Sequence, residues 1–152
     1  MLFRSDGIYR GDMSFGGLQL FAPLQGAASV TYAAGNNSVY ATDFSSNLYQ
    51  YSATGALLNT FSLSVNSTST ALAYEASSNS LWFAENGSNR VTNISLTGEV
   101  LSTSQVEGLG GNFYGGEIAG GPVSTVPEPS TYALMAFGMA GLGVLAKRRR
   151  AA

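Results

Sequence analysis

The chain repeats itself about every 42 residues, and this repeat restricts its possible folds more than any other feature. Segment 30–58 aligns with segment 72–101: an Asn/Ser turn, an apolar run, a Ser-Asn pair and a Thr-Gly turn recur in the same order. The offset is 42 residues up to Asn89 and 43 after it, which predicts that Arg90 is an inserted residue. A repeat of this length is typical of solenoids, propellers and arrays built from one supersecondary unit.

Each repeat predicts four short strands. The expected ranges are 29–34, 38–43, 48–52 and 56–62 in the first repeat, and 71–76, 80–85, 90–95 and 99–104 in the second. Thr54-Gly55 and Thr97-Gly98 predict hairpin turns before the fourth strands. The second strand of each repeat is the most apolar, so we expect it to be buried on both faces. Four strands in 40–45 residues indicate a β-propeller blade.

Incomplete units flank the two repeats. Ile8–Arg10 and the stretch 18–21 match the last two strands of a preceding unit, with Gly16-Gly17 at their hairpin, while 109–118 either opens a following unit or forms a flexible lead. We therefore expect an all-β fold. Residues 1–107 form a partial β-propeller of two full four-stranded antiparallel blades plus partial blades, and residues 108–125 form a Gly-rich linker.

The two predicted blades are fewer than a closed propeller needs. Closed propellers need about four to eight blades, and the first residues carry no basic stretch followed by an apolar run that would predict a signal peptide. We therefore expect this chain to be the C-terminal part of a longer protein.

The second repeat adds a family resemblance. Its run Ala84-Glu85-Asn86-Gly87-Ser88-Asn89-Arg90-Val91, followed by Thr97-Gly98, resembles an NHL or streptogramin-lyase-like propeller repeat. The first repeat departs from the pattern, because Leu48 stands where the arginine is expected. The resemblance covers about residues 27–104 and implies a propeller.

Enzymatic chemistry finds little support in the composition. The chain has no histidine and no cysteine, so the commonest general base, the commonest metal ligand and a thiolate nucleophile are missing. We predict no enzyme, no cofactor and no metal site. Asp43 and Glu85 follow equivalent strands, and we interpret them as turn acids that cap local backbone N–H groups rather than as carboxylates for a cation or a sugar. Four aromatic residues are interpreted as blade core rather than as a stacking platform: Tyr32, Tyr40, Tyr74 and Trp82.

Charge excludes one class of partner. Residues 1–126 contain three arginines against eight acidic residues. Nucleic-acid binding requires a basic face, so no nucleic acid is expected as a partner.

The C-terminal tail predicts a membrane segment. Residues 132–146 carry no charge and are directly followed by Lys147, Arg148, Arg149 and Arg150. We predict a transmembrane helix over 131–146, with the basic tail 147–150 holding the C-terminus in the cytoplasm and the body outside. The fifteen uncharged residues 132–146 rise about 22 Å as a helix, so spanning requires a thin bilayer or snorkelling of the basic side chains. The alternative, a buried helix of a soluble domain, would need an amphipathic stripe, which this segment lacks.

A short motif precedes the apolar segment: Val126, Pro127, Glu128, Pro129 and Ser130. Two prolines keep this stretch extended and outside helices and sheets. The motif, the Gly-containing span and the basic cluster together resemble the PEP-CTERM sorting signal of Gram-negative bacteria, here residues 126–152. The resemblance implies that an exosortase, an enzyme of the inner membrane, recognises and processes the tail, and family members commonly accompany exopolysaccharide and biofilm genes. The alternative is a Pro-rich linker to a permanent anchor.

Two functions remain open. The first is an exported cell-envelope protein, anchored in the inner membrane before processing and at the cell surface or secreted afterwards. Its propeller would be a non-catalytic, matrix- or biofilm-associated binder of exopolysaccharide or another surface ligand. The second is the C-terminal piece of a secreted propeller enzyme of lyase or lactonase type. Lyases with this repeat rely on histidine and a divalent ion, and the sequence has no histidine.

Overall fold

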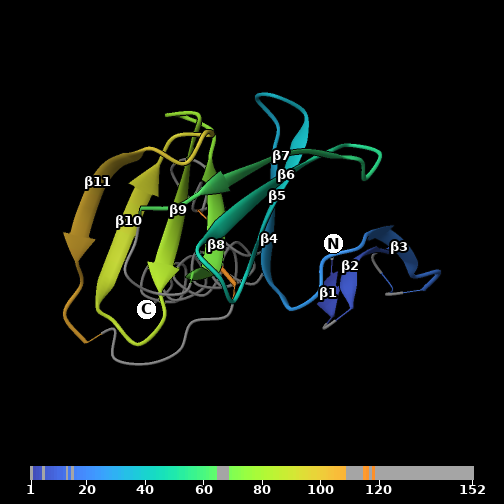
Figure 1. Cartoon of the computed structure of the whole chain (residues 1–152), viewed down its shortest axis with the longest axis horizontal. Coiled ribbons are helices and arrows are strands. Elements are labelled where there is room, and N and C mark those ends of the chain that lie inside the picture. The colour runs from blue at the N-terminus through green and yellow to red at the C-terminus, as the bar shows by residue number, and fades with distance from the viewer. Residues whose placement is uncertain are drawn as a thin grey trace, which may run out of the picture. The chain divides into compact units, whose positions relative to one another are not determined.

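The computed structural model describes residues 2–4, 6–12, 14, 16–64, 69–108, 115, 116 and 118. These residues form three antiparallel sheets (Figure 1). Within these ranges, no helix has the length and apolar character needed to cross a membrane. The predicted helix 131–146, the motif 126–130 and the basic tail 147–150 lie outside the described residues, and the boundaries at 107 and 125 stay predictions.

Two four-stranded sheets correspond to the two repeats. Blade one has the order β4-β5-β6-β7 and blade two the order β8-β9-β10-β11, with all neighbours antiparallel. The strands of blade one are β4 (Ala27–Ala33), β5 (Ser38–Asp43), β6 (Asn47–Ser52) and β7 (Leu57–Ser62); those of blade two are β8 (Ser69–Glu75), β9 (Ser80–Glu85), β10 (Arg90–Ile94) and β11 (Val100–Gln105). The prediction of two four-stranded antiparallel blades is confirmed.

The third sheet precedes blade one. This N-terminal sheet consists of β1 (Leu2–Arg4), β2 (Gly7–Arg10) and β3 (Gln19–Ala22), in the order β1-β2-β3. The sequence predicted the last two of these strands and missed β1. A strand of three residues is too short to show the alternation by which strands are detected.

The turns repeat along with the strands. Asn37 and Asn79 follow the first strand of each blade with φ values of 53° and 51°, a left-handed conformation that asparagine tolerates better than most residues. Gly55 and Gly98 occupy the predicted hairpins with φ values of 91° and 87°. Equivalent residues thus fix equivalent chain reversals in both blades.

The hydrogen bonds correct the alignment of the repeats. The N–H groups of Asn47 and Arg90 donate to Ser45 Oγ and Ser88 Oγ at 3.2 and 3.0 Å, so Asn47 is the counterpart of Arg90. Leu48 therefore matches Val91, and the predictions that Arg90 is the inserted residue and that Leu48 replaces it were wrong. The extra residue lies in the preceding turn, where two residues, 86 and 87, stand in place of residue 44.

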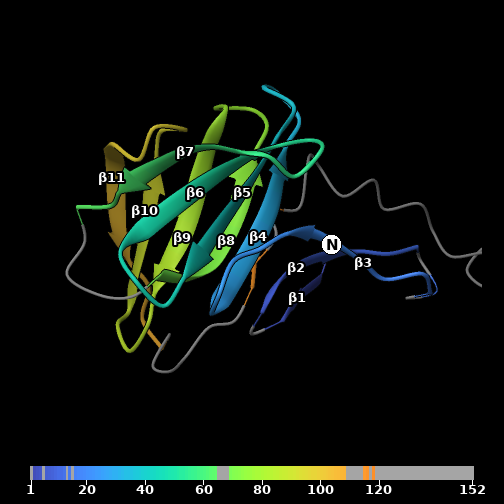
Figure 2. The same ribbon diagram turned by 45° about the vertical axis from the view of Figure 1, so that its right-hand side comes forward.

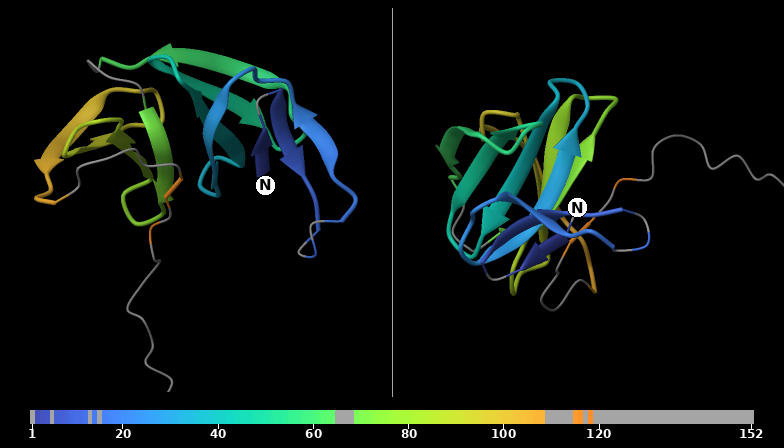
Figure 3. Two further views of the ribbon diagram at one scale, coloured as in Figure 1. Left: turned by 90° about the horizontal axis from the view of Figure 1, so that it is seen from below. Right: turned by 90° about the vertical axis from the view of Figure 1, so that its right-hand side faces the viewer.

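Alternating residues of blade one face two different cores. Val39 and Ala41 on β5 belong to a cluster shared with Ile8 and Ala22 of the N-terminal sheet. Tyr40 on the same strand belongs to a second cluster, shared with blade two. Figures 2 and 3 show blade one between the other two sheets. The prediction that the second strand is buried on both faces is confirmed for β5.

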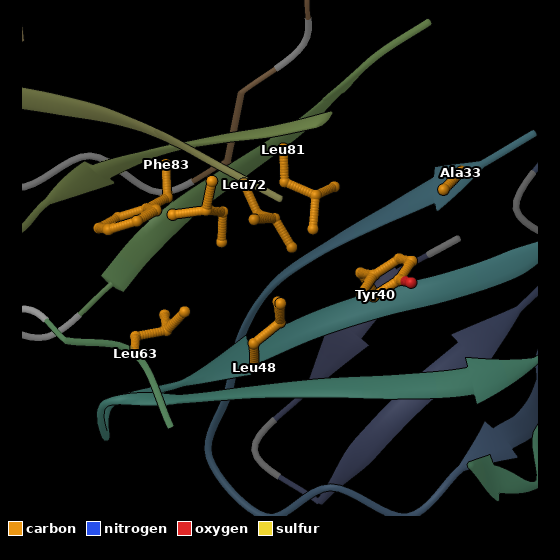
Figure 4. Packing of buried hydrophobic residues seen from close by; sticks show 8 residues of the cluster. Ala33, Tyr40, Leu48, Leu63, Leu72, Leu81 and Phe83 are labelled. Atoms are coloured by element: carbon orange, nitrogen blue, oxygen red, sulfur yellow. The ribbon is translucent and has the colours of Figure 1, made fainter. Parts of the chain in front are cut away.

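The second cluster joins the two blades. Figure 4 shows its side chains converging from both sheets. Its buried members are Ala33, Tyr40, Leu48, Leu63, Leu72, Leu81, Phe83 and Ile94. On β9 only one face is fully buried, because Leu81 and Phe83 point into this cluster while Trp82 and Ala84 stay half-buried.

Candidate functional site

The innermost strands of the two blades, β4 and β8, are joined by hydroxyl groups. The N–H of Leu72 donates to Ser29 Oγ at 2.8 Å, and the N–H of Tyr74 donates to Thr31 Oγ1 at 3.2 Å. Side-chain oxygens of β4 thus replace the ladder that two strands of one sheet would form, and the two blades are held in a defined register along this line.

A cavity of about 350 Å³ opens beside these strands. Its walls come from both blades and from a short segment downstream: Val30, Thr31, Tyr32, Tyr74, Gly116 and Ile118. Tyr32 is 49% exposed. The predicted assignment of Tyr32 to the blade core was wrong, because Tyr32 belongs to neither core cluster.

Two asparagines fix the tyrosine hydroxyls. Tyr32 Oη donates to Asn37 Oδ1 at 2.7 Å, and Tyr74 Oη donates to Asn79 Oδ1 at 2.9 Å. The N–H of Gly35 also donates to Tyr74 Oη at 3.2 Å, across the two blades. Both rings are therefore held at one end. The sequence signal for this arrangement was present but not used: each tyrosine is followed five residues later by an asparagine.

The other two aromatic residues differ from each other. Tyr40 is 1% exposed, which confirms it as blade core, and burial raises its pKa. Trp82 is half-buried and donates from Nε1 to Glu75 Oε2 at 2.8 Å. This bond, together with one from Ser78, lowers the pKa of Glu75.

Asp43 is a turn acid, as predicted. Its Oδ1 accepts from the N–H of Ser45 at 2.8 Å and from the Ser45 hydroxyl, and its Oδ2 accepts from Tyr49 Oη at 2.8 Å. Burial raises the pKa of Tyr49, and the hydrogen bond to Asp43 raises it further. The carboxylate therefore holds the turn between β5 and β6 closed.

Glu85, the counterpart of Asp43, has a different environment. Its side chain is 3% exposed, and Oε1 lies 3.5 Å from Nε of Arg90. Thr92 Oγ1 donates to the same oxygen at 3.3 Å. In the part of the chain that the structure describes, no group of three or more metal-ligating side chains comes together. Glu85 is thus a buried carboxylate that is ion-paired with Arg90.

A known protein-sorting motif matches the C-terminal part of the chain. Residues 125–150 match the PEP-CTERM protein-sorting motif, which includes the predicted motif 126–130 and the basic residues 147–150. A comparison of the sequence with curated proteins gives no match.

Solved structures with a similar fold include several large proteins. One is a catalytically inactive variant of virginiamycin B lyase from Staphylococcus aureus, with 19% identity and a TM-score of 0.45 over 55% of this chain and 28% of that one. Another is the β-propeller domain of Cps50 (Swd1) from Myceliophteria thermophila, with 13% identity and a TM-score of 0.46 over 61% and 29%. A third is Kuenenia stuttgartiensis hydrazine synthase, with 15% identity and a TM-score of 0.49 over 68% and 29%. This chain therefore spans less than a third of each of these three proteins.

The sorting motif has a direct consequence for the fate of the protein. The motif implies an exosortase as the processing partner and a secreted or cell-envelope protein. The body ahead of the motif is built of four-stranded antiparallel propeller blades. The chain is therefore an exported protein with a partial β-propeller body and a C-terminal PEP-CTERM sorting motif.

Proposed function

We propose that this protein is a non-catalytic binder of exopolysaccharide, displayed in the cell envelope or extracellular matrix after exosortase processing. The observation that carries the sorting part is the match of residues 125–150 to the PEP-CTERM motif. The binding part rests on Tyr32 and Tyr74 of the innermost strands β4 and β8, whose hydroxyls are held by asparagines.

The tail supplies the route. Before processing, the uncharged segment 132–146 spans the inner membrane, and the four cations that follow keep the C-terminus in the cytoplasm. The blades then lie outside the cytoplasm, and Pro127-Glu128-Pro129 directly precede the apolar segment in the sequence. Processing there releases the body to the cell surface or the medium.

The cavity lined by Tyr32 and Tyr74 is the proposed binding surface. Tyrosine combines a flat apolar ring with a polar end, and it loses little conformational entropy on binding. Tyr32 presents half of its surface while Asn37 holds its hydroxyl. The apolar face of a sugar ring fits such a surface, and the Thr31 hydroxyl on the cavity wall offers a polar contact.

Absence of catalysis is the expectation from the side chains. The sequence contains no histidine and no cysteine, and Asp43 and Glu85, the last residues of the second strands, are engaged in hydrogen bonds and an ion pair. The described residues around the cavity contribute hydroxyl and apolar groups but no carboxylate pair of the kind that glycoside hydrolysis requires.

The test compares two changes at one position. In the full chain, Tyr32→Ala removes the ring, and we expect it to weaken binding of the producing strain's exopolysaccharide by about fivefold to tenfold. Tyr32→Phe keeps the ring and should bind nearly as the unchanged protein does. Affinity gel electrophoresis at increasing polysaccharide concentration measures the dissociation constants.

The same samples test the absence of catalysis. After prolonged incubation, the length distribution of the polysaccharide should be unchanged. Equal affinity of the alanine variant and the unchanged protein would contradict the binding surface, and shortened polysaccharide would contradict the non-catalytic role.

A further inference from the structure

Arg10, the last residue of β2, differs from the other two described arginines in having no acidic partner. Arg4 lies 3.6 Å from Asp6, and Arg90 lies 3.5 Å from Glu85. Arg10 is exposed, and among the residues that the structure describes it takes part in no ion pair. A guanidinium group stays charged at neutral pH and carries five N–H donors. The donors of Arg10 are therefore available to a ligand.

A cavity of about 270 Å³ lies beside Arg10, where the N-terminal sheet meets the hairpin between β6 and β7. Its walls are formed by Arg10, Gln19, Leu20, Phe21, Ala53 and Thr54. These residues include one cation and no acid. Gln19 pairs with Arg10 across β2 and β3, so both side chains lie on the same face of the sheet. The cavity thus combines a positive charge with a neutral amide donor.

The blade-one hairpin forms a fixed wall of this cavity. The N–H of Ser52 donates to the carbonyl of Ala56 at 2.8 Å, and the N–H of Gly55 donates to the carbonyl of Ser52 at 3.0 Å. The carbonyl of Phe21 on β3 occupies the place where a Cβ at Gly55 would be. The hairpin is therefore closed by its own backbone bonds and packed directly on β3.

The hydroxyl proton of Thr54 has no acceptor in the described part of the chain. Ser52 Oγ accepts from the N–H groups of Thr54 and Ala56 at 3.2 and 3.1 Å, which uses both of its lone pairs. In the 2.9 Å contact between Ser52 Oγ and Thr54 Oγ1, Ser52 is therefore the donor. Thr54 is exposed on the cavity wall, so its own O–H can donate to a ligand there.

A second cavity beside Arg10 has a different charge. It measures about 310 Å³ and shares Arg10 and Gln19 with the first, but its walls include Asp12. Hydrogen bonds from Ser14 and Gly16 lower the pKa of Asp12, so its carboxylate stays ionised at neutral pH. A carboxylate on the wall repels an anion. An anion is therefore favoured in the first cavity and disfavoured in the second.

We propose that the first cavity binds the carboxylate of a uronic acid residue in an acidic exopolysaccharide. Arg10 donates two parallel N–H bonds to the carboxylate, a geometry that suits this group better than a neutral hydroxyl, and Thr54 donates a third. Leu20, which is 56% exposed, lies against the apolar face of the sugar ring. The proposal rests on the proposed function, exopolysaccharide binding, and adds the class of sugar that is recognised.

The first test uses one polymer in two forms, polygalacturonate and the same polymer with its carboxylates methyl-esterified. Biolayer interferometry of the full chain in non-ionic detergent, at low ionic strength to limit screening, measures the dissociation constants. Arg10→Gln should weaken binding of polygalacturonate about fivefold to tenfold and leave binding of the methyl ester unchanged. Arg4→Gln removes the same charge elsewhere on the N-terminal sheet and should change neither constant by more than about twofold.

The repeat supplies a matched pair for the hydroxyl. Thr97 is the blade-two counterpart of Thr54, because Ser95 Oγ makes the same three contacts around it. Its hairpin packs against blade one, where residues 44–74 carry no charge. Thr54→Val should weaken binding of polygalacturonate about threefold, and Thr97→Val should not. All four substituted side chains are exposed, so the variants should fold as the unchanged protein does, which circular dichroism checks.

Three results would overturn the proposal: equal weakening by Arg10→Gln and Arg4→Gln, equal effects of the two valine variants, or no binding of polygalacturonate by the unchanged protein. A failure of the proposed binding surface at Tyr32 gives a different result. Tyr32→Ala would then leave the binding of both polymer forms unchanged, while the loss caused by Arg10→Gln would persist.

Discussion

Replacing Phe83 by alanine will lower the free energy of unfolding by about 3–5 kcal/mol, the usual cost of removing a buried phenylalanine. Phe83 lies on β9 and is 1% exposed in the cluster between the two blades. Its ring packs among leucines from both sheets (Figure 4). The loss is large because the cavity would lie between the two blades. Their innermost strands are joined by bonds to side-chain hydroxyls and not by a ladder of backbone hydrogen bonds.

Urea titration followed by fluorescence and circular dichroism measures this change. Trp82 is the only tryptophan of the chain, so fluorescence reports on blade two. Leu101→Ala is the matched control: Leu101 lies on β11, is 58% exposed, and its truncation should change the free energy of unfolding by less than about 0.5 kcal/mol. A loss below about 1 kcal/mol for Phe83→Ala would contradict the packing described here.

The second large effect concerns the ion pair within blade two. Arg90→Met should lower the free energy of unfolding by about 2–3 kcal/mol, because it removes the Arg90 cation from beside the buried carboxylate of Glu85. The value lies below the full cost of breaking a buried pair because Arg90 is 38% exposed while Glu85 is 3% exposed. Adding Glu85→Gln to Arg90→Met should restore about 1 kcal/mol, because the amide removes the buried charge that has lost Arg90 and keeps the shape.

The control is the exposed pair of Arg4 and Asp6, whose side chains are 63% and 56% exposed with Nε and Oδ1 3.6 Å apart. Arg4→Met should cost less than about 1 kcal/mol even with the loss of its contact with the Tyr9 ring. If the variant carrying both Arg90→Met and Glu85→Gln is less stable than Arg90→Met alone, the prediction is contradicted, because other groups would then balance the charge of Glu85.

Most of the blade architecture could be predicted from the sequence. The second strands 38–43 and 80–85 were predicted with the bounds that the structure has, because continuous apolar runs between turn residues are the clearest strand signal. The hairpins at Gly55 and Gly98 were predicted for a similar reason, since glycine adopts the positive φ found there.

What the sequence did not reveal depended on contacts between distant residues. The position of the inserted residue was misjudged because Asn47 and Asn89 look equivalent in sequence. The hydrogen bonds to Ser45 and Ser88 show instead that Asn47 and Arg90 occupy equivalent positions in the two blades. The cavity beside Tyr32 and Tyr74 was not predicted either, because its walls also include Gly116 and Ile118, which lie far from both tyrosines in the sequence. Local patterns cannot show which of two repeated positions receives a neighbour and which remains open.

The intact mass of the protein recovered from cells tests the central claim most directly. The chain is expressed behind an added N-terminal signal peptide in a Gram-negative host with and without an exosortase, and its mass is measured in the membrane fraction, at the cell surface and in the medium. With the enzyme, we expect a shorter product that has lost its apolar, basic tail and is found at the surface or in the medium. Without it, or after replacing Pro127, Glu128 and Pro129 by alanine, the full-length chain should stay in the membrane. The same full-length mass in the same fraction under all three conditions would contradict the account.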